Sequence, residues 1–94
     1  MFNIDWDDLL LKSNVIIIDI RNSYKYLNGH VKNAINIQET ELVNNPNKYL
    51  NKNDIYYIYC DYGSSGKLVV SYLNRIGYNT VNINGGYYNF LFRK

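Results

Sequence analysis

The chain has 94 residues, which is enough for a single hydrophobic core without disulfide staples, so we expect residues 1–94 to form one domain. Its formal net charge is +2 at pH 7 and no basic block occurs, so the sequence gives no reason to expect nucleic acid or a membrane as a partner. A single cysteine excludes an internal disulfide, the first residues lack the pattern of a secretory signal, and no apolar run could cross a bilayer, so we expect a cytoplasmic protein.

The first part of the chain predicts two strands around a short helix. Residues 2–4 are typical of a short strand, and Asp5 is a suitable N-cap for the helix that follows. Residues 15–18 form a continuous β-branched run, as expected for a strand buried on both faces. The apolar stripe of the first helix consists of Trp6, Leu9 and Leu10.

The middle of the chain predicts short elements separated by turns. Ser23 is positioned to cap a helical turn over residues 24–27, and residues 34–37 alternate enough to form a short strand. A short helix is expected over residues 39–43. The segment around Pro46 is either a loop or a new helix start, since proline suits a first helical turn.

The last part predicts strand, helix, strand and helix in turn. Residues 55–59 are a continuous apolar run that is too short for a helix and rich in β-branched and aromatic residues. They therefore predict a strand that is covered on both faces of the sheet. Gly77 is placed to cap the next helix, residues 79–83 predict the last strand, and residues 87–92 a final helix. The apolar stripe expected on the longer helix is Leu68, Val69, Tyr72, Leu73 and Ile76. Alternating strands and helices indicate an α/β domain with a mostly parallel sheet.

The loop over residues 60–67 is the strongest candidate site. Cys60 ends a buried strand, and the glycines and serines behind it let several backbone N–H groups converge beside a helix N-terminus, where a thiolate is stabilised. Asp61 opposes that stabilisation. Asp19 and Arg21 follow another strand and are expected at the same edge of the sheet. Cys60 is therefore either a nucleophile or an inert buried thiol.

Several motifs in the chain, taken in order, resemble the single-domain rhodanese-like sulfurtransferases. They are Asp19-Ile20-Arg21, Gly29-His30-Val31 with Ala34-Ile35-Asn36-Ile37, Cys60-Asp61-Tyr62-Gly63, Gly77-Tyr78 and Asn84-Gly85-Gly86-Tyr87. The resemblance implies a three-layer α/β/α fold with a central, mostly parallel sheet of about five strands. It also implies that Cys60 accepts sulfane sulfur as a persulfide and passes it to a thiol or another nucleophile. The donor and the acceptor would be small molecules or proteins, and no metal or organic cofactor is required.

The chain departs from that family pattern within the loop. The family commonly has an arginine two residues after the loop glycine and a serine next, where this chain has Ser65 and Gly66. Because a cation is missing there, we expect poor turnover of an anionic donor such as thiosulfate. Lys67 is either a solvated surface residue or a cation that turns towards an anion. The substrate-binding residues expected on this basis are Asp61, Tyr62, Gly63, Ser64, Ser65, Gly66 and Lys67.

Other assignments remain open or are excluded by residue type. Arg21 is either an anion ligand or the partner of Asp19 in a structural ion pair. His30, the single histidine, would make either a structural hydrogen bond or a Cys-His pair. A cysteine phosphatase needs an arginine six positions after the cysteine, where Gly66 stands, and a thioredoxin-type protein needs a second cysteine. The remaining alternative to a sulfurtransferase is a rhodanese-like module that binds or regulates a protein partner. The sequence does not determine the oligomeric state.

Overall fold

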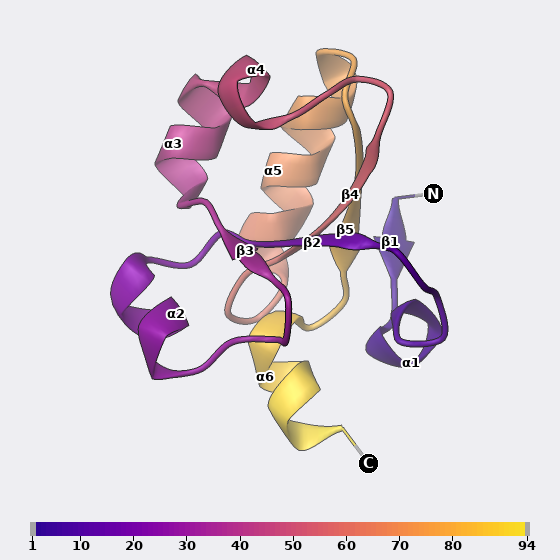
Figure 1. Cartoon of the computed structure of the whole chain (residues 1–94), viewed down its shortest axis with the longest axis vertical. Helices are drawn as coiled ribbons and strands as arrows, with labels where there is room; N and C mark the ends of the chain where they lie inside the picture. Colours follow the sequence, from indigo (N-terminus) through magenta and orange to yellow (C-terminus); the bar gives the residue numbers. More distant parts are fainter. Residues whose placement is uncertain (1, 94) are drawn as a thin grey trace.

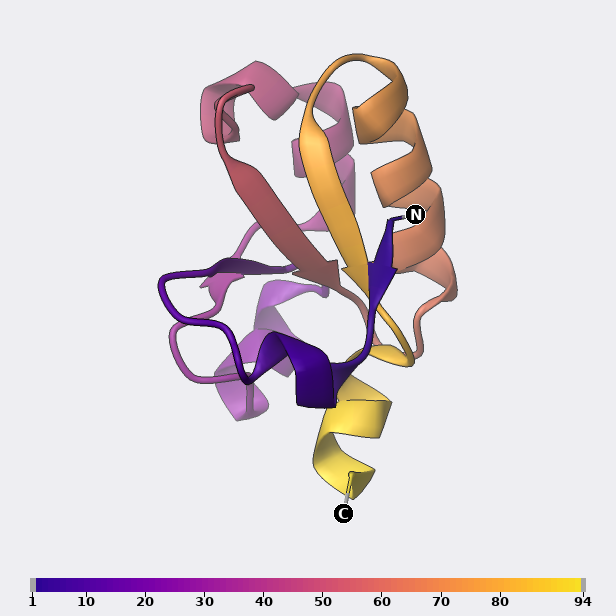
Figure 2. The same cartoon turned by 90° about the vertical axis from the view of Figure 1, so that its right-hand side faces the viewer.

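Five parallel strands form one sheet in the order β1-β5-β4-β2-β3 in the computed structural model, which describes residues 2–93 (Figures 1 and 2). Each crossover brings the chain back to the same edge of the sheet, so the carboxyl ends of the strands lie together. The strands are β1 (Asn3–Ile4), β2 (Ile16–Asp19), β3 (Ile35–Asn36), β4 (Ile55–Tyr59) and β5 (Asn79–Ile83). This confirms the α/β class and the parallel sheet expected from the sequence.

Within residues 2–93, six helices lie between and after the strands, and Figure 1 shows where each one lies. They are α1 (Trp6–Leu9), α2 (Ser23–Asn28), α3 (Glu39–Asn44), α4 (Pro46–Tyr49), α5 (Ser64–Arg75) and α6 (Gly86–Phe92). Pro46 occupies the first turn of α4, so this segment is a helix rather than a loop. No helix within residues 2–93 has the length and apolar character needed to cross a membrane.

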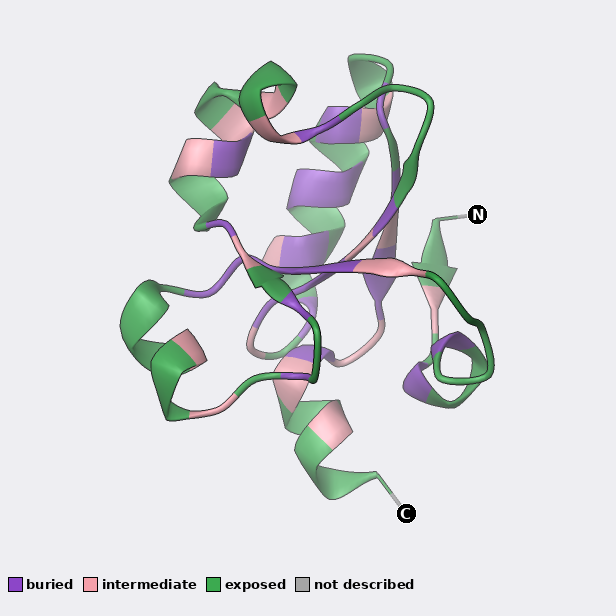
Figure 3. Cartoon of the chain, viewed as in Figure 1, coloured by how far each residue is buried: buried purple, intermediate pink, exposed green. Residues whose placement is uncertain are grey.

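The sheet has a hydrophobic core on each face, which makes the fold three-layered. Ile18 and Ile58 point to one face and pack with residues of α3 and α5 such as Leu42 and Leu73. The alternate positions of the same strands point to the opposite face, where they pack with Trp6 of α1 and with α6. Figure 3 shows the same division along α5, on which buried and exposed residues alternate. The central strands are therefore covered on both sides.

β4 and β2 are neighbours, and this brings the two polar strand ends together. Asp19 of β2 is in register with Tyr59 of β4, and the N–H of Ile20 donates to the carbonyl of Tyr59 at 3.0 Å. Cys60 follows immediately. The predicted meeting of the Asp19 and Cys60 segments at one edge of the sheet is therefore correct.

The apolar stripe predicted on α5 was correct for Val69 and Leu73 but wrong in its rotation, because it also included residues on the exposed side. The buried residues are Gly66, Val69, Val70 and Leu73, whereas Leu68, Tyr72 and Ile76 are exposed. The buried set follows i, i+3, i+4 and i+7 spacing, as expected for a helix that packs on a sheet with one narrow face. The rotation of α5 about its axis is determined by its packing against β4 and β5. It cannot be predicted from the apolar residues of the helix alone.

Two N-caps and one core residue in the first part of the chain also differ from expectation. Asn22, not Ser23, caps α2, because its side-chain oxygen accepts from the N–H of Lys25 at 2.9 Å. Asp5 stands at the N-cap of α1 but makes no capping bond, and its carboxylate accepts from Asn84 instead. Leu10 lies beyond the end of α1 and is 45% exposed, so it is not part of the core.

Candidate functional site

Cys60 lies at the bottom of a tight loop and is 6% exposed. Its Sγ accepts hydrogen bonds from the backbone N–H groups of Gly63 at 3.0 Å and Gly66 at 3.2 Å. Gly63 has a φ of +107°, in the left-handed region that favours glycine, and this turn directs the following N–H groups back towards the sulfur. We call Sγ and these two donors the Cys60 cradle.

The cradle sits at the N-terminus of the 12-residue helix α5. Unpaired N–H groups and the helix dipole at such a terminus favour negative charge. Ser64 and Ser65 form the start of this helix beside the sulfur. Ser65 stands where the family pattern has arginine, so that position carries a hydroxyl group and no cation.

Asp61 is held by a cation that lies far away in the sequence. Lys25 of α2 forms an ion pair with it, with 2.8 Å between Nζ and Oδ2. Both side chains are partly exposed, so the pair adds little stability, but it places a positive charge beside the carboxylate that follows Cys60. Lys25 could not be predicted from the sequence, because no local motif connects two residues 36 positions apart.

Asp19 and Arg21 form a buried ion pair next to the loop. Arg21 Nη2 lies 2.6 Å from Asp19 Oδ2 and also donates to the Gly29 carbonyl at 2.7 Å. The guanidinium carbon is 4.0 Å from the centre of the Tyr87 ring. Burial lowers the pKa of Arg21, but the hydrogen bond and the charge of Asp19 outweigh it and raise the pKa above its usual value. Arg21 thus ties β2, the Gly29 turn and α6 together.

His30 contacts α2. Its ring stacks on the ring of Tyr26 with 3.7 Å between centroids, and its Nδ1 lies 2.8 Å from the Tyr26 carbonyl oxygen. These contacts suit the structural alternative for this residue.

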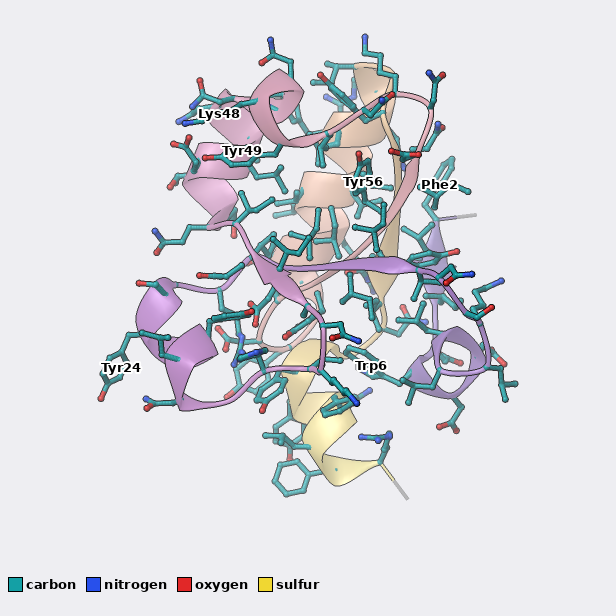
Figure 4. The ribbon with its side chains drawn as sticks, viewed as in Figure 1. Phe2, Trp6, Tyr24, Lys48, Tyr49 and Tyr56 are labelled. Carbon is teal, nitrogen blue, oxygen red and sulfur yellow. The ribbon has the colours of Figure 1, made fainter. Side chains whose placement is uncertain are left out.

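α6 holds the backbone of the Cys60 loop from the side opposite α5. The N–H of Tyr87 donates to the Cys60 carbonyl at 2.8 Å, and that of Tyr88 to the Asp61 carbonyl at 2.9 Å. Gly86 has a φ of +60°, and Trp6 of α1 donates to its carbonyl at 2.8 Å; the Trp6 side chain is labelled in Figure 4. The loop is therefore fixed by hydrogen bonds on both sides.

A small cavity of about 100 Å³ adjoins the loop and is lined by Asp61, Tyr62, Tyr87, Tyr88 and Leu91. Tyr62 and Tyr88 are exposed, with 5.5 Å between their ring centroids. A larger cavity of about 570 Å³ lies between α5 and β1; Lys67 is part of its wall and Cys60 is not. The loop is the candidate site, because Cys60 and the two backbone N–H groups that donate to its sulfur lie there.

The structure gives no sign of a metal centre in the part of the chain that it describes. Within residues 2–93, no three His, Cys, Asp or Glu side chains are grouped as ligands would be.

Comparison with known proteins agrees with this geometry. The model of the rhodanese-like domain family matches residues 5–92. A crystal structure from Staphylococcus saprophyticus subsp. saprophyticus has 35% identity and a TM-score of 0.87, covering 96% of this chain and 93% of that one. A rhodanese-like domain protein from Staphylococcus aureus has 36% identity and a TM-score of 0.82, covering 94% and 89%.

Curated relatives are longer. A tRNA uridine(34) hydroxylase from Wigglesworthia glossinidia brevipalpis is 33% identical over 98 residues, which cover 93% of this chain and 30% of the relative. The protein of the same name from Rickettsia typhi is 34% identical over 93 residues, which cover 93% and 38%. The chain thus spans about a third of the length of these relatives. With a family model that matches nearly all of its length and a parallel sheet that ends at Cys60 and its cradle, the chain belongs to the rhodanese-like domain family.

Proposed function

We propose that the chain is a sulfurtransferase that carries sulfane sulfur on Cys60. The observation that supports this most directly is the cradle, in which Gly63 and Gly66 donate to Sγ. Donors fixed in the folded backbone stabilise negative charge on sulfur without any rearrangement during the reaction.

The chemistry consists of two displacements. The Cys60 thiolate attacks the outer sulfur of a donor persulfide, R–S–SH; the Sγ–S bond forms, the donor S–S bond breaks, and its electron pair leaves with RS⁻. An acceptor thiolate then attacks the same outer sulfur, and Cys60 leaves as the thiolate. The outer sulfur keeps its proton in both steps, and no external oxidant or reductant is consumed.

The donor that suits this loop is a persulfide on a low-molecular-weight thiol or on a protein. Ser65 and Gly66 provide no cation for a doubly charged anion, and the nearby Lys25 is already paired with Asp61. Thiosulfate is therefore a poor donor in this proposal. Persulfide exchange requires Cys60 to remain a free thiol, which fits the cytoplasmic location expected from the single cysteine.

The test is intact-mass analysis of the protein after incubation with glutathione persulfide, mercaptopyruvate, thiosulfate or a cysteine desulfurase with cysteine. The wild-type chain should gain the mass of one sulfur atom from at least one of these donors, and the gain should disappear on treatment with excess thiol. Cys60→Ser is the matched control and should gain none. A wild-type chain that stays unmodified with every donor would contradict the proposal.

That negative result would favour a second function, a module that binds a protein partner. The exposed aromatic residues beside the loop are the observation that favours this function, since such residues are common in interfaces. Titration of a partner found by cross-linking would then give the same affinity for wild type and Cys60→Ser.

The names of the curated relatives suggest a third reading, participation in the modification of tRNA uridine 34. Those names describe proteins about three times as long as this chain, so we propose this only for an assembly that contains further domains. The idea is tested by expressing this chain together with those further domains in a strain that lacks the longer protein, and then analysing the nucleosides of its tRNA by mass spectrometry. Absence of the modified uridine would reject it.

A further inference from the structure

Asn82 is a fully buried polar residue on β5, beneath α5. Its Nδ2 donates to the side-chain oxygen of Asn3 at 3.1 Å, and its backbone N–H donates to the Phe2 carbonyl at 2.7 Å. On its other side it is in register with Ile58 of β4. The backbone at Asn82 is thus paired with a strand on each side, and its side chain is bonded to Asn3 of β1.

The Oδ1 atom of Asn82 has no hydrogen-bond partner, and within residues 2–93 no other buried side-chain nitrogen or oxygen lacks one. A buried acceptor without a donor is costly, so its presence calls for a physical explanation. Thr80 lies two residues earlier on the same face of the sheet, and its hydroxyl donates to Asn74 Oδ1 at 2.8 Å. The neighbouring polar residue is therefore satisfied, and Asn82 is the exception.

The unpartnered oxygen faces Gly66, the second donor of the Cys60 cradle. A Cβ atom on Gly66 would lie 2.3 Å from Asn82 Oδ1 and 3.6 Å from Cys60 Sγ. The first distance is shorter than any real contact of that kind, so Asn82 fills the space that a side chain at position 66 would need. The second shows that the same Gly66 position borders the reacting sulfur.

We propose that Asn82 is a positioning residue for the Cys60 cradle. Its amide oxygen is the surface on which the first turn of α5 rests, and this contact sets the distance from the Gly66 N–H to Sγ. Only glycine at position 66 permits that approach. Asn82 acts through Gly66 and does not touch the donor or the transferred sulfur. The inference deepens the proposed function, but stabilisation of the thiolate can be measured without any sulfur transfer.

The measurement is the rate of Cys60 alkylation by iodoacetamide as a function of pH, since the thiolate is the reactive form. In Gly66→Ala the new methyl group would clash with Asn82 and move the backbone N–H of residue 66 away from Sγ. The midpoint of this profile should therefore move upward by about one pH unit, as expected from the loss of one hydrogen bond to an anion. Asn82→Ala should also raise the midpoint, because the first turn of α5 loses its support. In the Asn82→Ala background the new methyl group has room, so adding Gly66→Ala should change the midpoint little.

The controls separate positioning from simple packing. Asn84→Ala removes an amide that bonds to Asp5 and should leave the midpoint unchanged. The charged groups beside the loop, Asp61 with Lys25 and the exposed Lys67, are the same in every variant, so they do not contribute to the differences. Thermal unfolding of each variant is measured in parallel.

Two results would overturn the proposal. One is an equal shift from Gly66→Ala in both backgrounds, which would mean that the two residues act independently. The other is an Asn82→Ala variant with a lower melting temperature but an unchanged alkylation profile, which would make Asn82 a packing residue only. If Gly66→Ala does not fold, Asn82→Ala alone decides. Because alkylation needs no sulfur donor, these outcomes are independent of whether Cys60 forms a persulfide.

Discussion

At the scale of single residues, the Cys60 loop depends on backbone donors instead of side-chain cations. Gly63 and Gly66 donate to the sulfur, and Asp61 is paired with Lys25. A persulfide, the donor proposed above, carries at most one charge. Thiosulfate carries two, and no cation stands at position 65, where the family pattern has arginine.

Ser65→Arg should therefore raise kcat/KM for thiosulfate by about tenfold, the value expected for one new charge-assisted hydrogen bond in the transition state. Initial rates with thiosulfate and cyanide measure the effect. Ser71→Arg, on the exposed side of the same helix, is the control and should leave the rate unchanged. Equal rates for wild type and Ser65→Arg would show that the missing arginine is not what limits this donor.

Arg21→Gln should destabilise the protein by about 3–5 kcal/mol, because the Asp19 carboxylate would remain buried without its partner. Urea unfolding gives the free energy of unfolding. Arg75→Gln removes an exposed arginine and should change that value by less than about 0.5 kcal/mol. A similar small change for Arg21→Gln would mean that the buried pair is not needed for the fold.

At the scale of elements, two helices hold the Cys60 loop from opposite sides. α5 supplies the donors to sulfur, and α6 bonds the loop carbonyls through the N–H groups of Tyr87 and Tyr88. The loop is therefore a junction of three elements, and a change in either helix start should affect the reactivity of Cys60.

Gly86→Ala tests the contribution of α6. A Cβ atom there would come within 2.4 Å of the Cys60 carbonyl oxygen, on a backbone already at a φ of +60°. We expect a loss of roughly 2–4 kcal/mol in the free energy of unfolding together with slower alkylation of Cys60.

Gly77→Ala is the matched control for this variant. It also has a positive φ, but its Cβ would meet only the end of the Lys52 side chain at 3.4 Å. It should cost about 1 kcal/mol and leave Cys60 unaffected. If both variants slowed alkylation equally, the effect would come from general destabilisation and not from α6.

At the scale of the whole molecule, Tyr59 is a central residue of the core that lies on the α1 and α6 side of the sheet. This residue is fully buried, and its ring packs edge-on to Trp6 and stacks with Tyr87. Burial and the nearby Asp19 raise the pKa of the Tyr59 hydroxyl above its ordinary value near 10. The folded protein therefore keeps this proton at pH values where the unfolded chain loses it.

The stability that depends on this proton is fully present below about pH 10 and is lost as the pH rises further, by about 1.4 kcal/mol per pH unit. Tyr59→Phe should show a less steep loss of stability between pH 10 and pH 11 than the wild type, measured by urea unfolding at each pH. Tyr24→Phe is the control, because Tyr24 points outward from α2 (Figure 4). Parallel pH dependences for wild type and Tyr59→Phe would contradict this explanation.

The sequence by itself determined the strands, most helix positions and the place of Cys60. Each of these depends on a continuous segment: residues 55–59 are short and rich in β-branched and aromatic residues, which predicts a strand, and the glycines after Cys60 permit the tight turn that follows it. The parallel α/β class followed from the order of these segments, and the family from the resemblance of the motifs around Asp19, Gly29, Cys60 and Gly85. The N-cap of α2 was predicted one residue too late, at Ser23 instead of Asn22, because asparagine and serine are both good N-caps.

Only the tertiary structure decided which side of α5 is buried, that Lys25 reaches Asp61, and that Asn82 lies against Gly66. These relations join residues far apart in the chain, and they arise when a helix docks on a sheet at one rotation and depth. A local hint did exist for Asn82, because Thr80 and Asn82 alternate with Val81 and Ile83 in the predicted last strand. The alternation alone does not show which groups the buried amide of Asn82 meets. That depends on how α5 packs on β5.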